Sequence, residues 1–384
     1  MAKIGNTRYA SLTAAYEALL DGDTIVILDA SASNESVIFS KCATVDATAV
    51  PGYRVSCADG FEAVSKGTDV WYVHSTALFD IYASNIKAGD NLDLYFYIQT
   101  EDLGNADKSE FSAQIVRYRK GVADAPVTIP GSQWTSYGSD YVRFCYNDIA
   151  AKEMTDKIFV TIYKGSEKVS NTRLETVENY ALRMLKSVAN AEEGTKDAAL
   201  RTTLVDMLYY GAECQDFFSD YNIEYRADAN LGEFAQYKSV DQTPTNNVSD
   251  VDGYLKASTI TAETSLVYTL YFDSGTITKD MAAYVSYVNH SGTTVTLPVV
   301  TGDGFNTSKS DLIGVDVTGL AVADGKQIIT CTIKESIAAD AETVTEVQGS
   351  IESYIAVDKG NTLALQKLMN FIVSAYDYFH FGES

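Results

Sequence analysis

Short apolar runs separated by turn residues dominate the chain from residue 77 to about residue 164. The clearest runs are residues 92–98 and 157–163, and both are rich in β-branched or aromatic side chains, which favour strands. Glycine, aspartate and asparagine lie between the runs and are typical of turns. Strands repeated at this spacing predict a β-sandwich.

The spacing of apolar residues then becomes helical. Apolar side chains recur every three or four positions between residues 174 and 184, and again between residues 200 and 211. The polar stretch 190–197 separates these two segments. We therefore expect two amphipathic helices joined as a helical hairpin, packed on the sandwich or next to it.

The last third of the chain repeats the middle third in the same order. Three segments carry the repeat: 83–92 with 257–266, 177–180 with 351–354, and 204–208 with 368–372. The positions held in common are Leu, Ile, Tyr and Ala, whereas a shared catalytic site should have left matching polar residues. The duplication therefore indicates a packing unit.

The second copy is expected to contain strands followed by helices. The expected strands are residues 266–272, 282–288, 293–300 and 328–333, and residues 347–355 are expected to be helical. A C-terminal helix carries one continuous apolar face, formed by Leu365, Leu368, Met369, Ile372, Ala375, Tyr376 and Phe379.

Residues 7–73 are expected to form a small α+β unit. Ser11 is placed to cap a helix whose apolar positions include Leu12, Ala15 and Leu19. An Asp-Gly-Asp turn ends this helix, and the apolar residues 24–28 follow as a strand. Further strands are expected near residues 36–39, 43–47 and 69–73.

The fold class is therefore expected to be α+β and multi-domain. A small N-terminal unit precedes two related modules, each an Ig-like β-sandwich followed by a helical hairpin. The stretch between the modules is polar, contains Pro244 and lacks periodicity, so it is the expected linker. The expected parts are residues 1–73 (attachment), 74–222 (first sandwich and helices), 223–251 (linker) and 252–384 (second, divergent copy).

Charge excludes several classes of partner. The chain has 384 residues, of which 46% are hydrophobic and 21% charged, as in ordinary folded proteins. Its 29 Lys and Arg against 52 Asp and Glu give a net charge of -23, which repels phosphate backbones and anionic lipids. Nucleic acid and membrane insertion are not expected. Such charge keeps a protein soluble when it is displayed at high density.

Five cysteines are scattered along the chain without a C-x-x-C spacing. We expect buried thiols rather than a disulfide framework, because a chain of this size can form a sufficient hydrophobic core without disulfide cross-links. Cys42 and Cys57 are the one pair close enough in sequence to be worth testing for a disulfide.

No secretory signal is visible at the N-terminus, and no apolar run is long enough to span a membrane. We expect a soluble protein made in the cytosol. A processed signal stays the alternative if Met1 was added to a trimmed chain.

Candidate chemistry is sparse. His74, His290 and His380 are far apart in sequence, and no motif indicates a catalytic or metal site that contains them. The abundant carboxylates are interpreted as solvated surface charge, and no nucleophile-elbow, Walker or H-E-x-x-H motif is present. No catalytic, cofactor-binding or metal-binding residue is predicted, and no cofactor.

Two weaker features have alternative interpretations. Residues 246–253 partly match a calcium-binding loop, but Val248 and Thr259 fall where the first and last ligands belong, so an EF-hand site fails. A looser calcium site stays open. The 26 tyrosines suit interfaces or sugar stacking, although half-burial in strands and helix contacts is the simpler interpretation.

Two stretches resemble known modules. Residues 9–12 (Tyr-Ala-Ser-Leu) with 20–28 (Leu-Asp-Gly-Asp-Thr-Ile-Val-Ile-Leu) resemble a repeat module of surface proteins in Gram-positive gut Firmicutes. A second module of those proteins is similar to residues 151–158, 177–181 and 204–218, covering with the first about residues 7–222. Cys214 replaces an alanine of that pattern, and the second copy lacks the Met-Thr-Asp and Tyr-Gly-Ala segments. The resemblance implies an extracellular, non-catalytic role without active-site residues.

These modules normally follow a signal peptide and adjoin a wall-anchoring or dockerin segment, and neither is visible here. We therefore expect a non-enzymatic structural or decoration protein of a bacteriophage virion, assembled in the host cytoplasm. Its expected partners are itself and other structural proteins, with a host glycan as a further option. The alternative is a bacterial cell-surface adhesin or carbohydrate-binding protein, and an enzyme such as a glycoside hydrolase is the third hypothesis.

Overall fold

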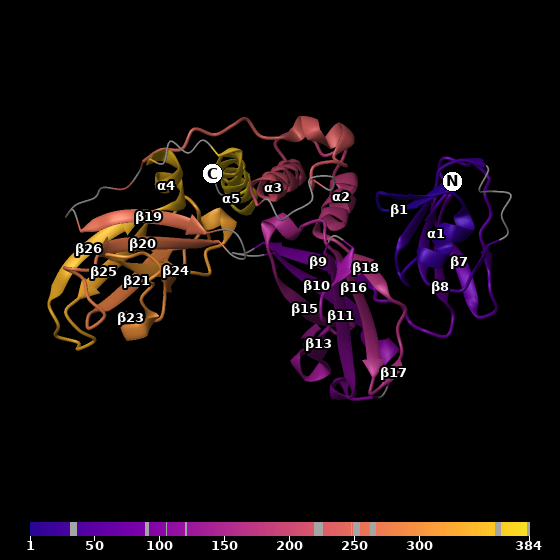
Figure 1. Ribbon diagram of the computed structural model, residues 1–384, viewed down its shortest axis with the longest axis horizontal. Coiled ribbons are helices and arrows are strands. Elements are labelled where there is room, and N and C mark those ends of the chain that lie inside the picture. Colours follow the sequence, from indigo (N-terminus) through magenta and orange to yellow (C-terminus); the bar gives the residue numbers. More distant parts are fainter. Residues whose placement is uncertain are drawn as a thin grey trace. The chain divides into compact units, whose positions relative to one another are not determined.

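The computed structural model in Figure 1 is α+β and multi-domain, as the sequence predicts. Two compact units divide the chain: one contains residues 1–85, 95–146 and 156–176, and the other residues 86–94, 147–155 and 177–384. In the part of the chain that the structure describes, no helix is long and apolar enough to cross a membrane. The described residues are 1–30, 37–88, 92–104, 106–119, 121–218, 226–246, 248, 254–261, 266–357 and 362–381.

Among its described residues, the N-terminal part has a mixed sheet and one α-helix. Its strand order is β2-β1-β3-β5-β8-β7, and β3 pairs with β5 in parallel. Ser11 caps the helix as predicted, because its Oγ accepts the Ala14 N–H at 3.0 Å. The elements are β1 (Ala2–Ile4), β2 (Thr7–Tyr9), α1 (Leu12–Ala18), β3 (Thr24–Ile27), β5 (Ala43–Asp46), β7 (Phe61–Gly67) and β8 (Val70–Ser75), beside the short parallel pair β4 (Ile38–Phe39) and β6 (Ser56–Cys57).

The first β part contains two sheets whose side chains meet at Trp134. This ring is buried and lies 5.2 Å from Phe144 of one sheet and 6.4 Å from Phe111 of the other, measured between ring centroids. One sheet has the order β14-β15-β10-β9, with β9 (Ala83–Ala88), β10 (Leu92–Gln99), β14 (Thr135–Tyr137) and β15 (Tyr141–Ile149). The other contains β11 (Phe111–Arg119), β12 (Val122–Ala123), β13 (Val127–Pro130), β16 (Lys157–Lys164), β17 (Glu167–Lys168) and β18 (Arg173–Glu175).

The second β part has a strand order that corresponds to that of the first, except that β14 and β17 have no counterpart among its described strands. Its sheets are β19-β20-β24 and β22-β21-β25-β26, with β23 also pairing with β21. In this comparison β20 corresponds to β10, and the pair β21 and β25 corresponds to β11 and β16. The strands are β19 (Leu255–Thr261), β20 (Val267–Asp273), β21 (Ala282–Val288), β22 (Thr294–Thr296), β23 (Val300–Thr301), β24 (Leu312–Val317), β25 (Ile329–Lys334) and β26 (Thr343–Gly349).

A capped 3-10 turn precedes the equivalent strands β16 and β25. In η5 (Ala151–Glu153) the Glu153 carboxylate accepts the Ala150 N–H at 3.1 Å. In η9 (Val322–Asp324) Asp324 accepts the Ala321 N–H at the same distance. Both carboxylates are buried, so each turn satisfies a backbone donor that would otherwise be costly to bury.

Each β part is followed by two helices. These are α2 (Val177–Ser187) and α3 (Lys196–Phe217) after the first part, and α4 (Ile351–Val357) and α5 (Leu363–Phe379) after the second. The backbone approaches closely where η9 meets α5, since a Cβ on Gly325 would lie only 2.4 Å from the Ile372 side chain. Helix α3 also packs on α5, where the Thr203 hydroxyl donates to the Ser374 carbonyl at 2.8 Å.

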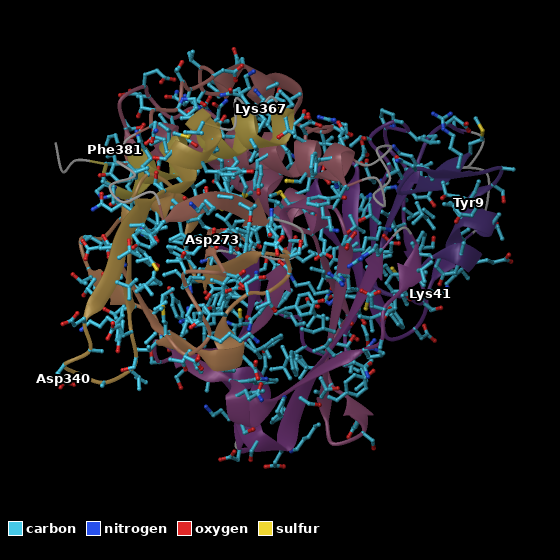
Figure 2. All side chains as sticks on the ribbon, turned by 60° about the vertical axis from the view of Figure 1, so that its left-hand side comes forward. Tyr9, Lys41, Asp273, Asp340, Lys367 and Phe381 are labelled. Atoms are coloured by element: carbon cyan, nitrogen blue, oxygen red, sulfur yellow. The ribbon has the colours of Figure 1, made fainter. Side chains whose placement is uncertain are left out.

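Residues 226–246 run along these helices and are held by buried polar side chains. Asn230 donates to Glu178 of α2 at 2.7 Å, and the Thr245 N–H and hydroxyl donate to Glu352 of α4. Asp241 accepts from Lys367 of α5, a residue labelled in Figure 2, at 2.8 Å. Glu178 and Glu352 occupy the same position of the repeat, so the duplicated helices hold this segment in the same way.

Two helices begin later in the structure than the sequence predicts. Leu174 lies in β18 and pairs with Phe159, and the helix starts at Val177. Val347 lies in β26 and pairs with Cys331, and that helix starts at Ile351. In both places a buried strand residue falls by chance at a helical spacing from the helix that follows.

Asn171 joins the N-terminal part to the first β part. This residue is 1% exposed. Its Oδ1 accepts hydrogen bonds from the Cys42 thiol and the Ser75 N–H. Its Nδ2 donates to the Ser75 and Leu78 carbonyls and to the Asp80 carboxylate. Ion pairs also join these parts: Lys157 Nζ lies 2.7 Å from Asp23 Oδ2, and Lys168 Nζ lies 2.6 Å from Asp21 Oδ2.

We expect Asn171→Ala to lower the free energy of unfolding by about 3 kcal/mol, because several buried backbone groups lose their partners. Chemical denaturation followed by circular dichroism measures the effect. Asn246→Ala, at an exposed asparagine, is the matched control and should change stability by less than about 0.5 kcal/mol. An equal effect of the two substitutions would contradict the role of Asn171.

Burial raises the pKa of Glu178, the hydrogen bond from Asn230 lowers it less, and the charge of Asp228 adds to the increase. A carboxyl group whose pKa is raised by folding stabilises the fold when protonated, and this contribution is lost as the pH rises from the unfolded-state pKa through the folded-state value. We therefore expect Glu178→Gln to be about 1 kcal/mol more stable than the wild type at pH 7, with the gain vanishing near pH 4.

The measurement is urea denaturation across this pH range, with the exposed Glu233→Gln as control. A gain from Glu178→Gln that does not depend on pH would contradict the titration of Glu178.

Candidate functional site

The outer face of the sheet β14-β15-β10-β9 carries a cluster of tyrosines around one arginine. Side chains alternate along a strand, so Phe96 and Phe144 point into the core while their neighbours in β10 and β15 point outward. We name this surface the tyrosine face. It consists of Tyr82, Tyr95, Tyr97, Tyr137, Tyr141 and Arg143.

The register of the sheet brings these residues together. Tyr137 of β14 pairs with Tyr141 of β15, and Arg143 follows two positions later on the same face. Tyr82 comes just before β9 and is placed by its backbone N–H, which donates to the Tyr97 carbonyl at 2.9 Å. Because every member lies on or next to a paired strand, the face is held by backbone hydrogen bonds.

Arg143 lies between two rings at the centre of this face. Its guanidinium carbon is 4.8 Å from the ring centroid of Tyr95 and 4.8 Å from that of Tyr137. Such contacts stabilise the cation through the electron-rich faces of the rings. A hydrogen bond with Tyr97 raises the pKa of the Arg143 guanidinium above its ordinary value. The charge is therefore permanent and fixed in place.

No carboxylate pairs with Arg143 among the described residues, and its Nε is buried without a hydrogen-bond partner there. Arg117 of the same unit, by contrast, has its Nε 2.7 Å from Asp124. The tyrosine face thus presents one unpaired positive charge on a chain whose net charge is strongly negative.

The exposed tyrosines surround this charge. Tyr82 is 55% and Tyr137 50% exposed, and the rings of Tyr82 and Tyr141 lie 4.9 Å apart. A hydrogen bond with Tyr82 raises the pKa of Tyr141, so the Tyr141 phenol stays neutral at physiological pH. The arrangement can bind by stacking, by donating phenol hydrogen bonds and by pairing Arg143 with an acid.

Two of the histidines are brought together elsewhere. His290 follows β21 and His380 follows α5, and their ring centroids are 6.5 Å apart. The Nδ1 of His290 lies 2.7 Å from Asp324, the acid that caps η9. His290 also donates its backbone N–H to Asp324 at 2.6 Å. Sequence reasoning does not predict that these two histidines lie close together, because 89 residues separate them and no motif unites them.

His74 belongs to the other compact unit, in the N-terminal part. Its ring nitrogens are 3.1 Å from Glu62 and 3.4 Å from Asp80, and its ring stacks on Tyr72. The described residues contain no group of three or more His, Cys, Asp or Glu that could hold a metal ion. Most of the calcium-like stretch 246–253 lies outside the described residues.

All five cysteines are free, including Cys42 and Cys57, which make no disulfide. Burial raises the pKa of the Cys42 thiol to about 11 and that of Cys214 and Cys331 to about 12. A buried thiol with a raised pKa is a poor nucleophile because the thiolate is the reactive form. These cysteines are therefore interpreted as packing residues.

We expect a thiol reagent such as DTNB at pH 8 to modify only the two half-buried cysteines, Cys57 and Cys145, in the folded protein. The same protein in 6 M guanidinium without reductant should release five equivalents of chromophore. More than two rapidly reacting thiols in the folded protein, or fewer than five in the unfolded one, would contradict this assignment.

The comparisons with known proteins assign neither site. No protein-family model matches the chain, and no curated protein matches it. The tyrosine face and the His290–His380 cluster therefore rest on the geometry of this chain alone.

Proposed function

We propose that the protein is a non-enzymatic structural component of an assembled particle, namely a bacteriophage virion, and that it docks through its tyrosine face. The observation that carries this proposal is Arg143, held between Tyr95 and Tyr137 without an acidic partner among the described residues. A fixed and unpaired guanidinium within an aromatic surface is the composition of a protein–protein contact.

Interface energetics support this role. Tyrosine and arginine are enriched among the residues that dominate binding energy, and a tyrosine orders few torsion angles when it is buried. Arg143 is preorganised by its two ring contacts, so pairing with a carboxylate of the partner costs little side-chain entropy. The partner is expected to place an acidic residue against Arg143.

Charge also favours contact at this face. A net charge of -23 makes most encounters between copies of the chain repulsive. Tyr82, Tyr95, Tyr97 and Tyr137 are uncharged, and Arg143 is positive, so the tyrosine face is a place where an acidic neighbour is attracted. Repulsion elsewhere keeps densely displayed copies from aggregating.

We propose that both β parts are Ig-like sandwiches, as in many display and cell-surface proteins. The support is the pair of antiparallel sheets that meet at Trp134 and the corresponding strand order of the second part. Buried polar contacts such as those of Asn171 fix neighbouring parts to one another, which suits a protein whose task is to hold a surface in position.

A bacterial adhesin is the second candidate, and the exposed rings of Tyr82 and Tyr137 favour it. Exposed aromatic side chains offer flat apolar surfaces next to hydroxyl groups, which suits the stacking of sugars as well as of proteins. The location of the protein on a particle or on a cell distinguishes the two functions.

We expect antibodies against the recombinant chain to label purified virions of the source phage at a fixed copy number. Tagged Arg143→Ala and Tyr137→Ala chains supplied during infection should be incorporated at least tenfold less than the wild type, because each substitution removes a central contact of the interface. Quantitative mass spectrometry of purified particles measures the incorporation.

Tyr284→Ala is the matched control, since Tyr284 also faces a cation, Lys334 at 5.6 Å, but belongs to the second β part. Its incorporation should equal that of the wild type. If the antibodies label intact bacterial cells and not phage particles, this result would contradict the virion proposal and favour the adhesin. Normal incorporation of the Arg143 and Tyr137 variants would show that the tyrosine face is not the docking surface.

A further inference from the structure

A pocket of about 490 Å³ lies where the end of α5 meets the turn between β21 and β22. Its volume falls within the range of small-molecule sites, roughly 300–1,000 Å³. The residues that matter for recognition are Asn289 and His290 from the turn, Gln327 from the segment after η9, and Tyr376, Phe379 and His380 from the end of α5. All belong to one compact unit.

Aromatic rings form the apolar wall. The ring centroids of His290 and Phe379 are 4.9 Å apart, and those of Tyr376 and His380 are 3.9 Å apart in a stacked arrangement. Phe379 is 45% exposed although it contacts other rings. Its uncovered surface is available to an apolar face of a ligand.

The wall is fixed before any ligand arrives. Asp324 is buried and holds His290 through both its ring Nδ1 and its backbone N–H. The backbone N–H of His380 donates to the Tyr376 carbonyl at 3.0 Å, and the ring Nδ1 lies 3.0 Å from the same oxygen. Since these rings need no reordering, little conformational entropy opposes binding.

Amide groups supply the polar edge. The Asn289 Oδ1 accepts from the Ser291 N–H, the Ser291 hydroxyl and the Thr293 N–H, so the carboxamide is locked with its NH₂ group still able to donate. The Gln327 side chain has no hydrogen-bond partner among the described residues. The pocket therefore combines aromatic surface with amides that can both donate and accept.

The charge of the lining selects a neutral ligand. Among the described residues, no lysine, arginine, aspartate or glutamate lines the pocket, and the nearby Asp324 is already bonded to His290 and Ala321. A phosphorylated ligand would find no lysine or arginine in this described lining and would be repelled by the net charge of the chain. A ligand with one apolar face and a rim of hydroxyl groups matches both the rings and the amides.

We propose that this pocket binds one neutral pyranose unit of a glycan. The apolar C–H face of the sugar stacks on Phe379, and its hydroxyl groups bond to Asn289 and Gln327. The site is distinct from the tyrosine face, so it stands or falls separately from the proposed structural role.

The test uses the full chain and a panel of neutral sugars, namely glucose, galactose, mannose and N-acetylglucosamine, with adenosine as the competing neutral aromatic ligand. The chain has three histidines, and two of them line the pocket, so the imidazole signals in a proton NMR titration report on the site directly. We expect one sugar to shift the His290 and His380 signals saturably, while His74 stays unmoved as an internal control.

Phe379→Ala and Gln327→Ala should each weaken this binding about tenfold, because each removes one group that contacts the ligand. Phe381→Ala is the matched control, since Phe381 is 40% exposed but does not line the pocket, and it should leave the affinity unchanged. Unchanged far-ultraviolet circular dichroism shows that the variants are folded.

Absence of any saturable shift with all four sugars up to 50 mM would overturn the proposal. So would binding that Phe379→Ala and Gln327→Ala leave unchanged, or a shift of His74 equal to those of the other two histidines. Tighter binding of adenosine than of every sugar would also overturn it and would assign the pocket to a nucleobase.

Discussion

A buried carboxylate closing a tight turn is the constraint on which both duplicated parts depend. The carboxylates of Glu153 and Asp324 each accept the backbone N–H of the residue three positions earlier. The carbonyl of the residue after Glu153 accepts the N–H of Glu178, and the carbonyl of the residue after Asp324 accepts the N–H of Glu352. Both glutamates stand at the start of a helix. One acidic side chain therefore fixes the turn, the strand that follows it and the start of the helical layer. Its loss would leave a buried donor unpaired in a place that water does not reach.

Local chemistry predicted the elements well, and their limits less well. The cap at Ser11 and the apolar runs of β10 and β16 follow from the residues themselves. Leu174 and Val347 were assigned to helices because periodicity alone cannot separate a buried strand residue from the helix that follows it. The domain boundaries after residues 73, 222 and 251 stay predictions.

The sites depend on register and tertiary packing, which a single sequence does not reveal. Tyr95 and Tyr97 lie two positions apart in one strand, but Tyr137 and Arg143 join them only through strand pairing. Glu178 and Glu352 occupy equivalent positions of the repeat, but their shared function, holding the connecting segment, depends on tertiary contacts that the repeat alone does not indicate.

The packing of α3 on α5 has a consequence for how the chain is made. About 150 residues separate the end of α3 from the start of α5, so at roughly 5–20 residues per second the ribosome takes about 10–30 s to supply the partner helix. During that interval the apolar surface of α3 that α5 later covers, including Tyr210 opposite Phe371, lacks this cover. Until α5 has been synthesised, this surface of α3 can be buried only by other contacts, so the helical layer of the chain is completed late in synthesis.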